Sequence, residues 1–417
     1  MHYCLVTYGS RGDVQPFIYL ALGLKKKGHR VTLAAPGNFK QLVEGYQIDF
    51  YPLFGDTEEL VMSPEFRKVI STGSNIGFTR MALKTMRNTH TSVFDDVYKA
   101  CGNADAIIAV NICILYAAAV AEKLGKKWLL IQLNPPMIPT REFPMPMFNF
   151  PDIKWLNNYT YIAINNILWQ VQKKDYAMFR ERLGLPPLKG SLFAKVIEDK
   201  VPMIHAFSPE LISTPCDWDE HHIVAGFFKQ PAPSAGDRVH LSAEFETWLA
   251  AGEKPLYIGF GSIPFPKPQK LSAIIKEILA TSTIRIIYCS GWSELPDLPS
   301  NPNLFVIEKA DHGWLLPKCR AAVIHGGIGT IAAVLEAGIP AIVASLFVDQ
   351  PVWGKIIAQK KLGVHIPWRK LTARSILNAL KQVEEPPIAE TVKEVNAKLM
   401  KEDGVAVAVQ TIEKYCS

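Results

Sequence analysis

The segment at residues 324–353 constrains the fold of this chain more than any other stretch. A short apolar run at 321–324 leads into the glycine-rich turn HGGIGT at 325–330, which is followed by a helical pattern that stops at Gly338. A second apolar run at 341–347 then ends in an Asp-Gln pair. Strand, glycine turn, helix and strand in this order predict a βαβ unit of an α/β protein.

The glycine turn predicts an anion site. Glycines ahead of a helix let a ligand approach the backbone, and the free N–H groups and positive end of the helix favour a phosphate there. The turn lacks the spacing and the lysine of a P-loop, and it lacks the GxGxxG pattern and the acidic residue of a dinucleotide fold. We therefore expect a diphosphate held by the backbone and His325, with Asp349 and Gln350 beside it to bind hydroxyls. The alternative is tight packing of the strand against the helix without a ligand.

Two motifs in this sequence resemble a known family. The C-terminal motif comprises HGGxGT at 325–330, GxP at 338–340 and DQxxW at 349–353, and the N-terminal motif is GSRGDVQPF at 9–17. Both resemble the nucleotide-sugar glycosyltransferases of the GT-B fold, in the branch that contains the sterol 3-glucosyltransferases and the glycopeptide-antibiotic glycosyltransferases. The resemblance covers nearly the whole chain. It implies two Rossmann-like domains whose parallel sheets face a central cleft.

The length of 417 residues suits two domains of about 200 residues each. We expect an N-terminal acceptor-binding domain at 1–228, a linker with prolines, serine and glycine at 229–240, and a C-terminal nucleotide-sugar-binding domain at 241–398. The end of the chain, 399–417, includes an amphipathic stretch. By resemblance, it forms a helix that packs back on the N-terminal domain.

The composition narrows the function classes. A net charge of +6 without a long basic run argues against nucleic-acid binding. Seven scattered cysteines without CxxC spacing predict neither a disulfide framework nor a zinc site and fit a reducing cytoplasm. A strand pattern begins almost at Met1, which leaves no room for a signal peptide, and the most apolar run, 106–121, is short for a bilayer span and contains Asn111. We therefore expect a soluble, cytoplasmic protein.

Asp13 is the predicted catalytic base. Residues 2–8 predict a first strand and a helix is expected from about Val14, which places Asp13 in the intervening loop. A carboxylate within hydrogen-bond reach of an alcohol can take its proton as the new bond forms. The alternative is that Asp13 only caps the following helix. The resemblance favours catalysis, because the aspartate of this loop is thought to be the base in that branch. No orienting partner of Asp13 is evident, and Ser10 and Arg11 are assigned to donor binding.

The segment at 134–172 differs in composition from the rest of the chain. Proline, methionine and aromatic residues crowd this stretch, which follows a predicted strand ending near Leu133. Such side chains suit an adaptable apolar pocket, and we interpret the segment as acceptor-binding, with a lip that touches a membrane. The alternative is an ordinary loop and helix packed on the core. The predicted acceptor-binding residues are Met137, Phe143, Met147, Phe148 and Trp169.

The resemblance adds further donor-binding residues. Ser262 is expected to contact the diphosphate and Trp292 to lie near the nucleotide base. His312 and Trp314 fall in a segment with which relatives hold uracil, although the frequent Trp-x-Pro-Gln pattern is absent here. The predicted donor-binding residues are Ser10, Arg11, Ser262, Trp292, His312, Trp314, His325, Gly326, Gly327, Gly329, Thr330, Asp349 and Gln350.

The tripeptide at 217–219, Asp-Trp-Asp, has the D-x-D spelling of metal-dependent sugar transferases. It falls in a turn-like segment just before the last expected strand of the first domain, where the family pattern also carries an Asp-Trp pair. We therefore interpret it as structural, and we expect neither a metal nor a cofactor.

These features predict an inverting, metal-independent glycosyltransferase. The default reaction moves glucose from UDP-glucose to a hydroxyl of a lipophilic acceptor such as a sterol or triterpenoid. The expected partners are a UDP-sugar and this acceptor, with a peripheral membrane contact, no nucleic acid and a monomeric or weakly dimeric state. One alternative is a nucleotide-sugar epimerase or hydrolase, which would need acid and base residues beyond Asp13. The other is a non-catalytic nucleotide-sugar-binding protein, which would not need to keep Asp13, Asp349 and Gln350.

Overall fold

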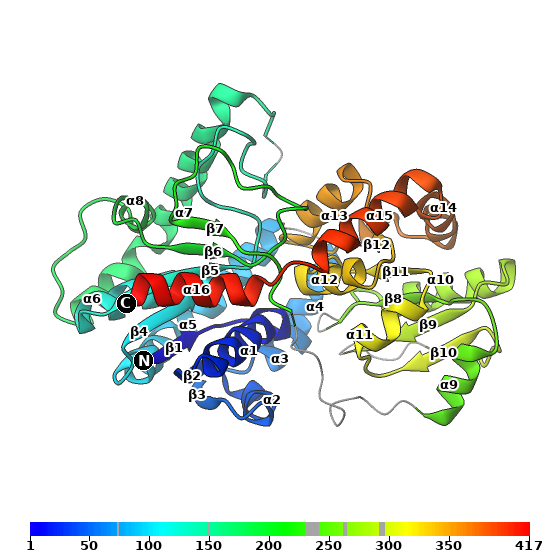
Figure 1. Ribbon diagram of the computed structural model, residues 1–417, viewed down its shortest axis with the longest axis horizontal. Helices are drawn as coiled ribbons and strands as arrows, with labels where there is room; N and C mark the ends of the chain where they lie inside the picture. The colour runs from blue at the N-terminus through cyan, green and yellow to red at the C-terminus, as the bar shows by residue number, and fades with distance from the viewer. Residues whose placement is uncertain (73–74, 149, 230–241, 262–264, 292–296) are drawn as a thin grey trace. The chain divides into compact units, whose positions relative to one another are not determined.

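The computed structural model describes residues 1–417 except 73–74, 149, 230–241, 262–264 and 292–296 (Figure 1). The chain divides into two compact units. Unit 1 comprises Met1–Leu60, Thr79–Lys229 and Asp403–Ser417, and unit 2 comprises Val61–Phe78 and Gln230–Glu402.

Unit 1 is built on a parallel sheet with the strand order β3-β2-β1-β4-β5-β6-β7. The inner strands are short apolar runs with almost no solvent exposure, as expected for a parallel sheet covered by helices on both faces. The strands are β1 (His2–Val6), β2 (Arg30–Pro36), β3 (Asp49–Leu53), β4 (Ala106–Val110), β5 (Lys127–Gln132), β6 (Met203–His205) and β7 (His222–Val224).

Helices cover this sheet and connect its strands. The last helix of the chain, α16, packs along α1 within unit 1 (Figure 1). Gly23 of α1 allows this approach, because a Cβ atom at Gly23 would lie 2.4 Å from Cγ1 of Val405. The helices that lie in or enter unit 1 are α1 (Arg11–Lys26), α2 (Lys40–Gly45), α3 (Thr57–Met62), α5 (Asn75–Cys101), α6 (Ile114–Leu124), α7 (Lys154–Arg182), α8 (Leu192–Glu198) and α16 (Gly404–Cys416).

Unit 2 repeats the plan with the parallel strand order β10-β9-β8-β11-β12-β13. Its strands are β8 (Leu256–Gly259), β9 (Ile286–Cys289), β10 (Leu304–Ile307), β11 (Ala321–Ile324), β12 (Ala341–Val343) and β13 (Gly363–His365). Its helices are α4 (Pro64–Thr72), α9 (Ala243–Ala250), α10 (Pro268–Thr281), α11 (His312–Leu315), α12 (Ile328–Glu336), α13 (Gln350–Gln359), α14 (Ala373–Val383) and α15 (Pro386–Leu399). Within the described residues, every helix of the chain is too short or too polar to cross a bilayer.

The predicted fold class is confirmed, since two parallel sheets are flanked by helices. The predicted boundaries differ in several places. Strand β1 ends at Val6 rather than at residue 8. Helix α1 begins at Arg11 rather than near Val14, and the apolar run at 341–347 is strand only to Val343. The segment Val61–Phe78 was expected in the first domain but groups with unit 2, where the ring of Phe66 packs edge-on against Phe347 at 5.9 Å. Most of the expected linker lies outside the described residues.

Candidate active site

Asp13 lies in the first turn of α1, directly after the carboxyl end of β1. Its Oδ2 atom accepts a hydrogen bond from the backbone N–H of Ser10 at 2.8 Å and another from the Ser10 hydroxyl at 3.1 Å. This is the arrangement of a capping residue, so Asp13 does cap α1. It does not exclude catalysis, because Oδ1 makes no hydrogen bond within the described part of the chain and can take a further donor.

The environment of Asp13 makes it more basic than an ordinary aspartate. Burial raises the pKa of Asp13 from 3.8 to about 6, against the opposing effect of the hydrogen bonds from Ser10. The residue keeps some contact with solvent, but protein atoms crowd its carboxylate. Gly9, with φ of 140°, is part of this crowding, because a Cβ atom there would lie 2.3 Å from Oδ2 of Asp13. A carboxylate that is deprotonated near neutral pH, yet basic, suits a general base.

Asn111, which was not predicted as a site residue, lies after the strand next to β1. It follows β4, whose carboxyl end lies next to that of β1 in the sheet. Its Oδ1 atom is buried without a hydrogen-bond partner among the described residues. A buried oxygen in that state is costly unless a ligand or water donates to it. The sequence marked Asn111 only as a polar interruption of an apolar run, and nothing but the fold reveals that its oxygen is unpaired.

The predicted diphosphate loop joins β11 to α12 in unit 2. Gly326 adopts φ of 94°, and a Cβ atom there would lie 2.6 Å from Cγ1 of Val343. Gly327 is the N-cap of α12, and a Cβ atom on it would lie 2.5 Å from Nε2 of His325. The turn therefore needs both glycines. Beside the next glycine, Gly329, a Cβ atom would meet nothing within 4 Å, so the first turn of α12 borders open space. Free N–H groups at such a helix start favour a phosphate.

His325 is buried in this loop and is neutral at physiological pH. Burial, aided by the nearby His312, lowers the pKa of His325 to about 4. Its Nδ1 atom is buried and has no hydrogen-bond partner among the described residues. A neutral imidazole can donate one N–H to an anion without adding a charge to the site.

Loops that follow three strands lie in contact with one another near His325. Gly261 follows β8 with φ of 64°, and a Cβ atom on it would lie 3.5 Å from Cε1 of His325. Gly291 follows β9 with φ of 56°, and a Cβ atom on it would lie 2.3 Å from the carbonyl oxygen of Gly261. These contacts place three loops at the carboxyl edge of one parallel sheet, where ligands of open α/β folds bind.

His312 and Trp314 lie on or beside α11 in the same unit. The Nε2 atom of His312 lies 3.1 Å from the hydroxyl of Tyr257, a residue of β8. The ammonium of Lys318 lies 4.1 Å from the centre of the Trp314 ring, so one face of that ring already packs on a cation. His312 is thus tied to the site through Tyr257 and its influence on His325, whereas Trp314 packs locally.

Asp349 and Gln350 begin α13, after a turn in which Val348 adopts φ of 57°. The Oε1 atom of buried Gln350 accepts hydrogen bonds from the backbone N–H groups of Leu346 at 2.8 Å and Phe347 at 3.3 Å. The indole N–H of Trp353 donates to Oδ2 of Asp349 at 3.1 Å. The side chains of Asp349 and Gln350 therefore form hydrogen bonds within their own segment, and their contact with sugar hydroxyls stays a prediction.

The predicted acceptor residues make separate local contacts, and their role in acceptor binding stays a prediction. Met137, Phe143 and Met147 pack against a small core of Met145, Tyr161 and Ile164, between the loop before α7 and α7 itself. Phe148 is 51% exposed and packs loosely on Phe150, and Trp169 contacts Tyr176 further along α7. This packing fits the ordinary loop-and-helix interpretation for the first three side chains.

Asp217 and Trp218 hold that loop in place. The two carboxylate oxygens of Asp217 accept from the Thr140 hydroxyl at 2.6 Å and the Arg141 N–H at 2.8 Å. The Trp218 ring stacks on His205 with 4.6 Å between centroids. Asp217 is therefore structural, as predicted, and no cluster of three or more His, Cys, Asp or Glu suited to a metal occurs among the described residues.

The remaining predicted residues are placed as follows. Arg11 is exposed, and its Nε donates to Oε1 of Gln15 at 3.1 Å. Ser10 and Arg11 belong to unit 1, whereas the other predicted donor residues that the structure describes belong to unit 2. Thr330 donates its backbone N–H to the carbonyl of Gly327 at 3.0 Å as part of the first turn of α12. Ser262 and Trp292 lie outside the described residues.

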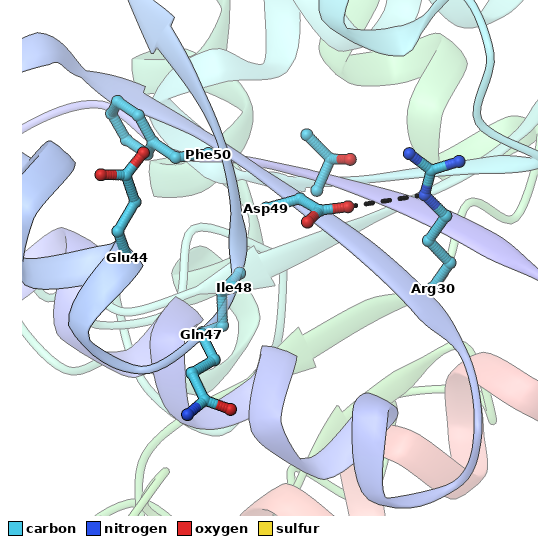
Figure 2. Close-up of a pocket in the computed structure, with 7 residues that line it drawn as sticks. Arg30, Glu44, Gln47, Ile48, Asp49 and Phe50 are labelled. Carbon is cyan, nitrogen blue, oxygen red and sulfur yellow. Dashed lines mark ion pairs between the residues drawn. The ribbon is translucent and has the colours of Figure 1, made fainter.

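A hollow of about 640 Å³ in unit 1 lies away from these residues. Figure 2 shows its lining, in which Arg30 and Asp49 form an ion pair of 3.5 Å. Both residues begin their strands, so the hollow is at the amino edge of the sheet. Ligands of open α/β folds bind at the opposite, carboxyl edge, where Asp13 lies, and we do not assign this hollow to the reaction.

Comparisons with known proteins agree with this architecture. Residues 3–140 match the glycosyltransferase family 28 N-terminal domain, and residues 275–413 match the erythromycin biosynthesis protein CIII-like C-terminal domain. Among solved structures, the glycosyltransferase of kitacinnamycin superposes with a TM-score of 0.73 at 18% identity, covering 99% of this chain and 98% of that one. The glycosyltransferase VinC, solved with dTDP, superposes with a TM-score of 0.68 at 14% identity, covering 100% and 99%. These structures share the GT-B fold.

Two plant proteins are similar along the whole chain. The sterol 3-beta-glucosyltransferase UGT80B1 of Arabidopsis thaliana is 34% identical over 99% of this chain and 67% of its own length. UGT80A2 of the same plant is 31% identical over 100% of this chain and 66% of its own length, so the chain spans about two thirds of each relative. The chain therefore belongs to the UDP-glycosyltransferase family that includes these sterol 3-beta-glucosyltransferases, and it is an enzyme of the GT-B fold.

Proposed function

We propose that this enzyme transfers glucose from UDP-glucose to a hydroxyl of a sterol or similar lipophilic alcohol, with inversion at the anomeric carbon and without a metal ion. The observation that carries the proposal is that the loops after β8, β9 and β11 meet near His325, at the start of α12. Relatives named as sterol 3-beta-glucosyltransferases support the choice of sugar and acceptor.

The donor diphosphate lies against the first turn of α12. Backbone N–H groups at the helix start, the positive end of the helix and the neutral His325 ring all favour the negative charge that grows on the leaving group. The open space beside Gly329 leaves room for a phosphate next to these N–H groups. In this arrangement fixed dipoles stabilise the charge that a divalent cation stabilises in D-x-D transferases. The Asp-Trp-Asp tripeptide of this chain has the D-x-D spelling, but its Asp217 makes structural hydrogen bonds.

Asp13 acts on the acceptor. Its Oδ1 atom accepts the proton of the acceptor hydroxyl while that oxygen forms a bond to the anomeric carbon and the bond from this carbon to UDP breaks. The attack comes from the face opposite UDP, so the configuration inverts. A pKa of about 6 leaves Asp13 ionised at neutral pH yet basic enough to hold the proton it receives.

The experiment that tests this function is UDP release by the purified protein with UDP-glucose, with and without a mixed pool of lipophilic alcohols that contains sterols. Release that depends on the pool is the expected result, and subdivision of the pool identifies the acceptor. Equal release with and without the pool would indicate a hydrolase, and UDP binding without any release would indicate a non-catalytic binding protein. Activity that survives EDTA is expected, and its loss with recovery on added Mg²⁺ would refute the metal-independent step.

A further inference from the structure

Helix α7 exposes a row of large apolar side chains in its amino-terminal half. Trp155 is 71% exposed, Tyr159 58% and Ile162 42%, and their spacing of four and three residues places them on one face of the helix. Ile153, just before the helix, is also exposed. Single exposed apolar residues are common on proteins, but a contiguous row marks a surface that binds something.

The charge pattern of α7 separates this row from an ordinary surface helix. Residues 155–172 contain no Asp, Glu, Lys or Arg, whereas Lys154 precedes the stretch and Lys173-Lys174 follows it. A solvent-exposed helix face normally carries charges. An uncharged face with Trp and Tyr, bounded by lysines, is instead typical of a helix that lies in the plane of a membrane interface, where aromatic rings sit at headgroup level.

A cationic hollow of about 570 Å³ lies at the amino end of the row. It is lined by Arg141, Lys154, Trp155, Asn158 and Tyr159. Among the described residues, neither the Arg141 guanidinium nor the Lys154 ammonium forms an ion pair. Two cations beside two amphipathic rings complement a phospholipid phosphate with its acyl chains alongside.

Two carboxylates near the hollow are held in other contacts. Asp152 accepts from the side-chain amide of Asn157 at 2.8 Å. Glu142 accepts from the backbone N–H of Cys216 at 2.8 Å. Both still carry negative charge, so the cationic character of this surface comes from Arg141 and Lys154 and from the lysine pair at 173–174.

The inner face of α7 is already filled, so the exposed row cannot turn inward. Tyr161 and Ile164 pack with Met145 of the preceding loop. The Thr160 hydroxyl accepts from the Met145 N–H at 2.8 Å, and the Asn157 amide donates to the carbonyl of Arg141 at 3.0 Å. This half of α7 extends away from the sheet of unit 1 (Figure 1).

We propose that the row of Ile153, Trp155, Tyr159 and Ile162 docks on the surface of an anionic phospholipid bilayer, with Arg141 and Lys154 at the phosphates. The inference rests on the proposed function in one respect, because a lipophilic acceptor resides in the bilayer and docking brings the acceptor-binding unit to it. Charge complementarity favours a bilayer over a second copy of this chain, which carries a net charge of +6 and would repel a cationic patch.

The test is sedimentation of the purified protein with vesicles of phosphatidylcholine alone or mixed with phosphatidylserine, without any donor or acceptor. The wild type is expected to bind the mixed vesicles. The variant Trp155→Ser/Tyr159→Ser/Ile162→Ser is expected to lose at least tenfold in affinity, because it removes the side chains that enter the interface. A matched variant removes three exposed apolar residues from elsewhere on the chain, Ile197→Ser/Met400→Ser/Val407→Ser, and is expected to bind as the wild type does.

A second variant, Arg141→Gln/Lys154→Gln, tests the charges. Each charge near an anionic surface is worth about fivefold in affinity, so this variant is expected to bind mixed vesicles about 20- to 30-fold more weakly and to lose most of its salt dependence. Far-UV circular dichroism and thermal melting show whether each variant is folded, and the charge variant leaves the packed inner face of α7 untouched.

The outcome for docking is independent of the outcome for the reaction, because binding is measured without substrates. A wild type that ignores mixed vesicles, or a folded triple variant that binds them equally well, would overturn the proposal. Loss of self-association in the triple variant, with no change in vesicle binding, would show that the row joins two copies instead. If the protein binds vesicles but releases no UDP with any alcohol, the docking surface is supported and the proposed reaction is refuted.

Discussion

The Oδ2 atom of Asp13 lies 2.8 Å from the backbone nitrogen and 3.1 Å from the hydroxyl of Ser10, so one carboxylate oxygen caps α1 while the other remains available to a ligand. One residue thus holds the helix start and presents a base at the same point. The two roles can be separated by substitutions that keep the cap and remove the basicity.

Asp13→Asn keeps an oxygen for the cap but cannot accept the acceptor proton. Acceptor-dependent turnover is expected to fall by about 10²- to 10⁴-fold, because that is the usual worth of a general base. UDP affinity, measured by calorimetry, should not change. Asp403→Asn is the matched control, since Asp403 caps α16 through the N–H of Ala406 and has no proposed role in the reaction. A near-normal rate for Asp13→Asn would refute the base assignment.

The raised pKa of Asp13 predicts two pH effects. The rate should rise as the pH passes through about 6, because only the ionised carboxylate accepts a proton, and Asp13→Asn should lack this rise.

For stability, the folded state binds this proton more tightly than the unfolded state, in which the pKa of Asp13 is near 3.8. The proton therefore stabilises the fold below about pH 4, and this contribution is lost as the pH rises through about 6. Denaturant titrations measure this contribution as the free energy of unfolding of the wild type minus that of Asp13→Asn. This value should fall as the pH rises through about 6. A rise with pH would contradict the sign.

His325→Ala tests the donor loop. Removal of one hydrogen bond to a charged phosphate costs about 1.5–3 kcal/mol, which is about 10- to 150-fold in UDP affinity. Because the pKa of His325 is about 4, its ring does not titrate between pH 5 and 8, and the wild-type affinity should show no histidine step in that range. His29→Ala, which removes an ion pair with Glu413 in unit 1, is the control and should leave UDP affinity unchanged. A clear loss of affinity near pH 6.5 in the wild type alone would show that the ring is charged when it binds.

Two glycines of the same loop predict opposite effects on the free protein. Gly327→Ala drives a methyl group to within 2.5 Å of Nε2 of His325, and it should destabilise the free protein by about 1–3 kcal/mol. Gly329→Ala adds a methyl group in open space within a helix, and it should stabilise the free protein by up to about 1 kcal/mol. Both should weaken UDP binding, Gly329→Ala because its methyl group takes the place of the phosphate. Thermal melts with and without UDP separate the two effects, with Gly45→Ala as a helical control. Unchanged UDP affinity in Gly329→Ala would move the diphosphate away from this turn.

Much of the fold can be predicted from the sequence because buried parallel strands are short apolar runs with clear ends. The strand Ala321–Ile324 is predicted to the residue for this reason. The run at 341–347 misleads, because its last residues are buried in a loop and burial alone does not define a strand. The start of α1 was placed too late because its cap is formed by a side chain of the helix itself, Asp13.

The site shows where sequence patterns stop being informative. Glycines and His325 of the donor loop follow a recognisable motif, whereas the place of Phe66 beside Phe347 depends on a contact between distant segments. Whether Oδ1 of Asn111 has a hydrogen-bond partner depends on the residues that the fold packs around it, and no local sequence pattern contains that information. The methionine and aromatic residues at 137–150 show the same limit, since composition cannot tell a ligand pocket from a small self-filled core.

Helix α16 has a consequence for any shortened form of this protein. Met1–Leu60 and Asp403–Ser417 both belong to unit 1, so unit 2 is inserted into a fold that only the last residues complete. Loss of α16 (Gly404–Cys416) would therefore disturb the part of unit 1 that the first residues form. It would uncover Gly23 and its neighbours on α1, the helix that carries Asp13, while every strand of the unit that holds the diphosphate loop would still be made.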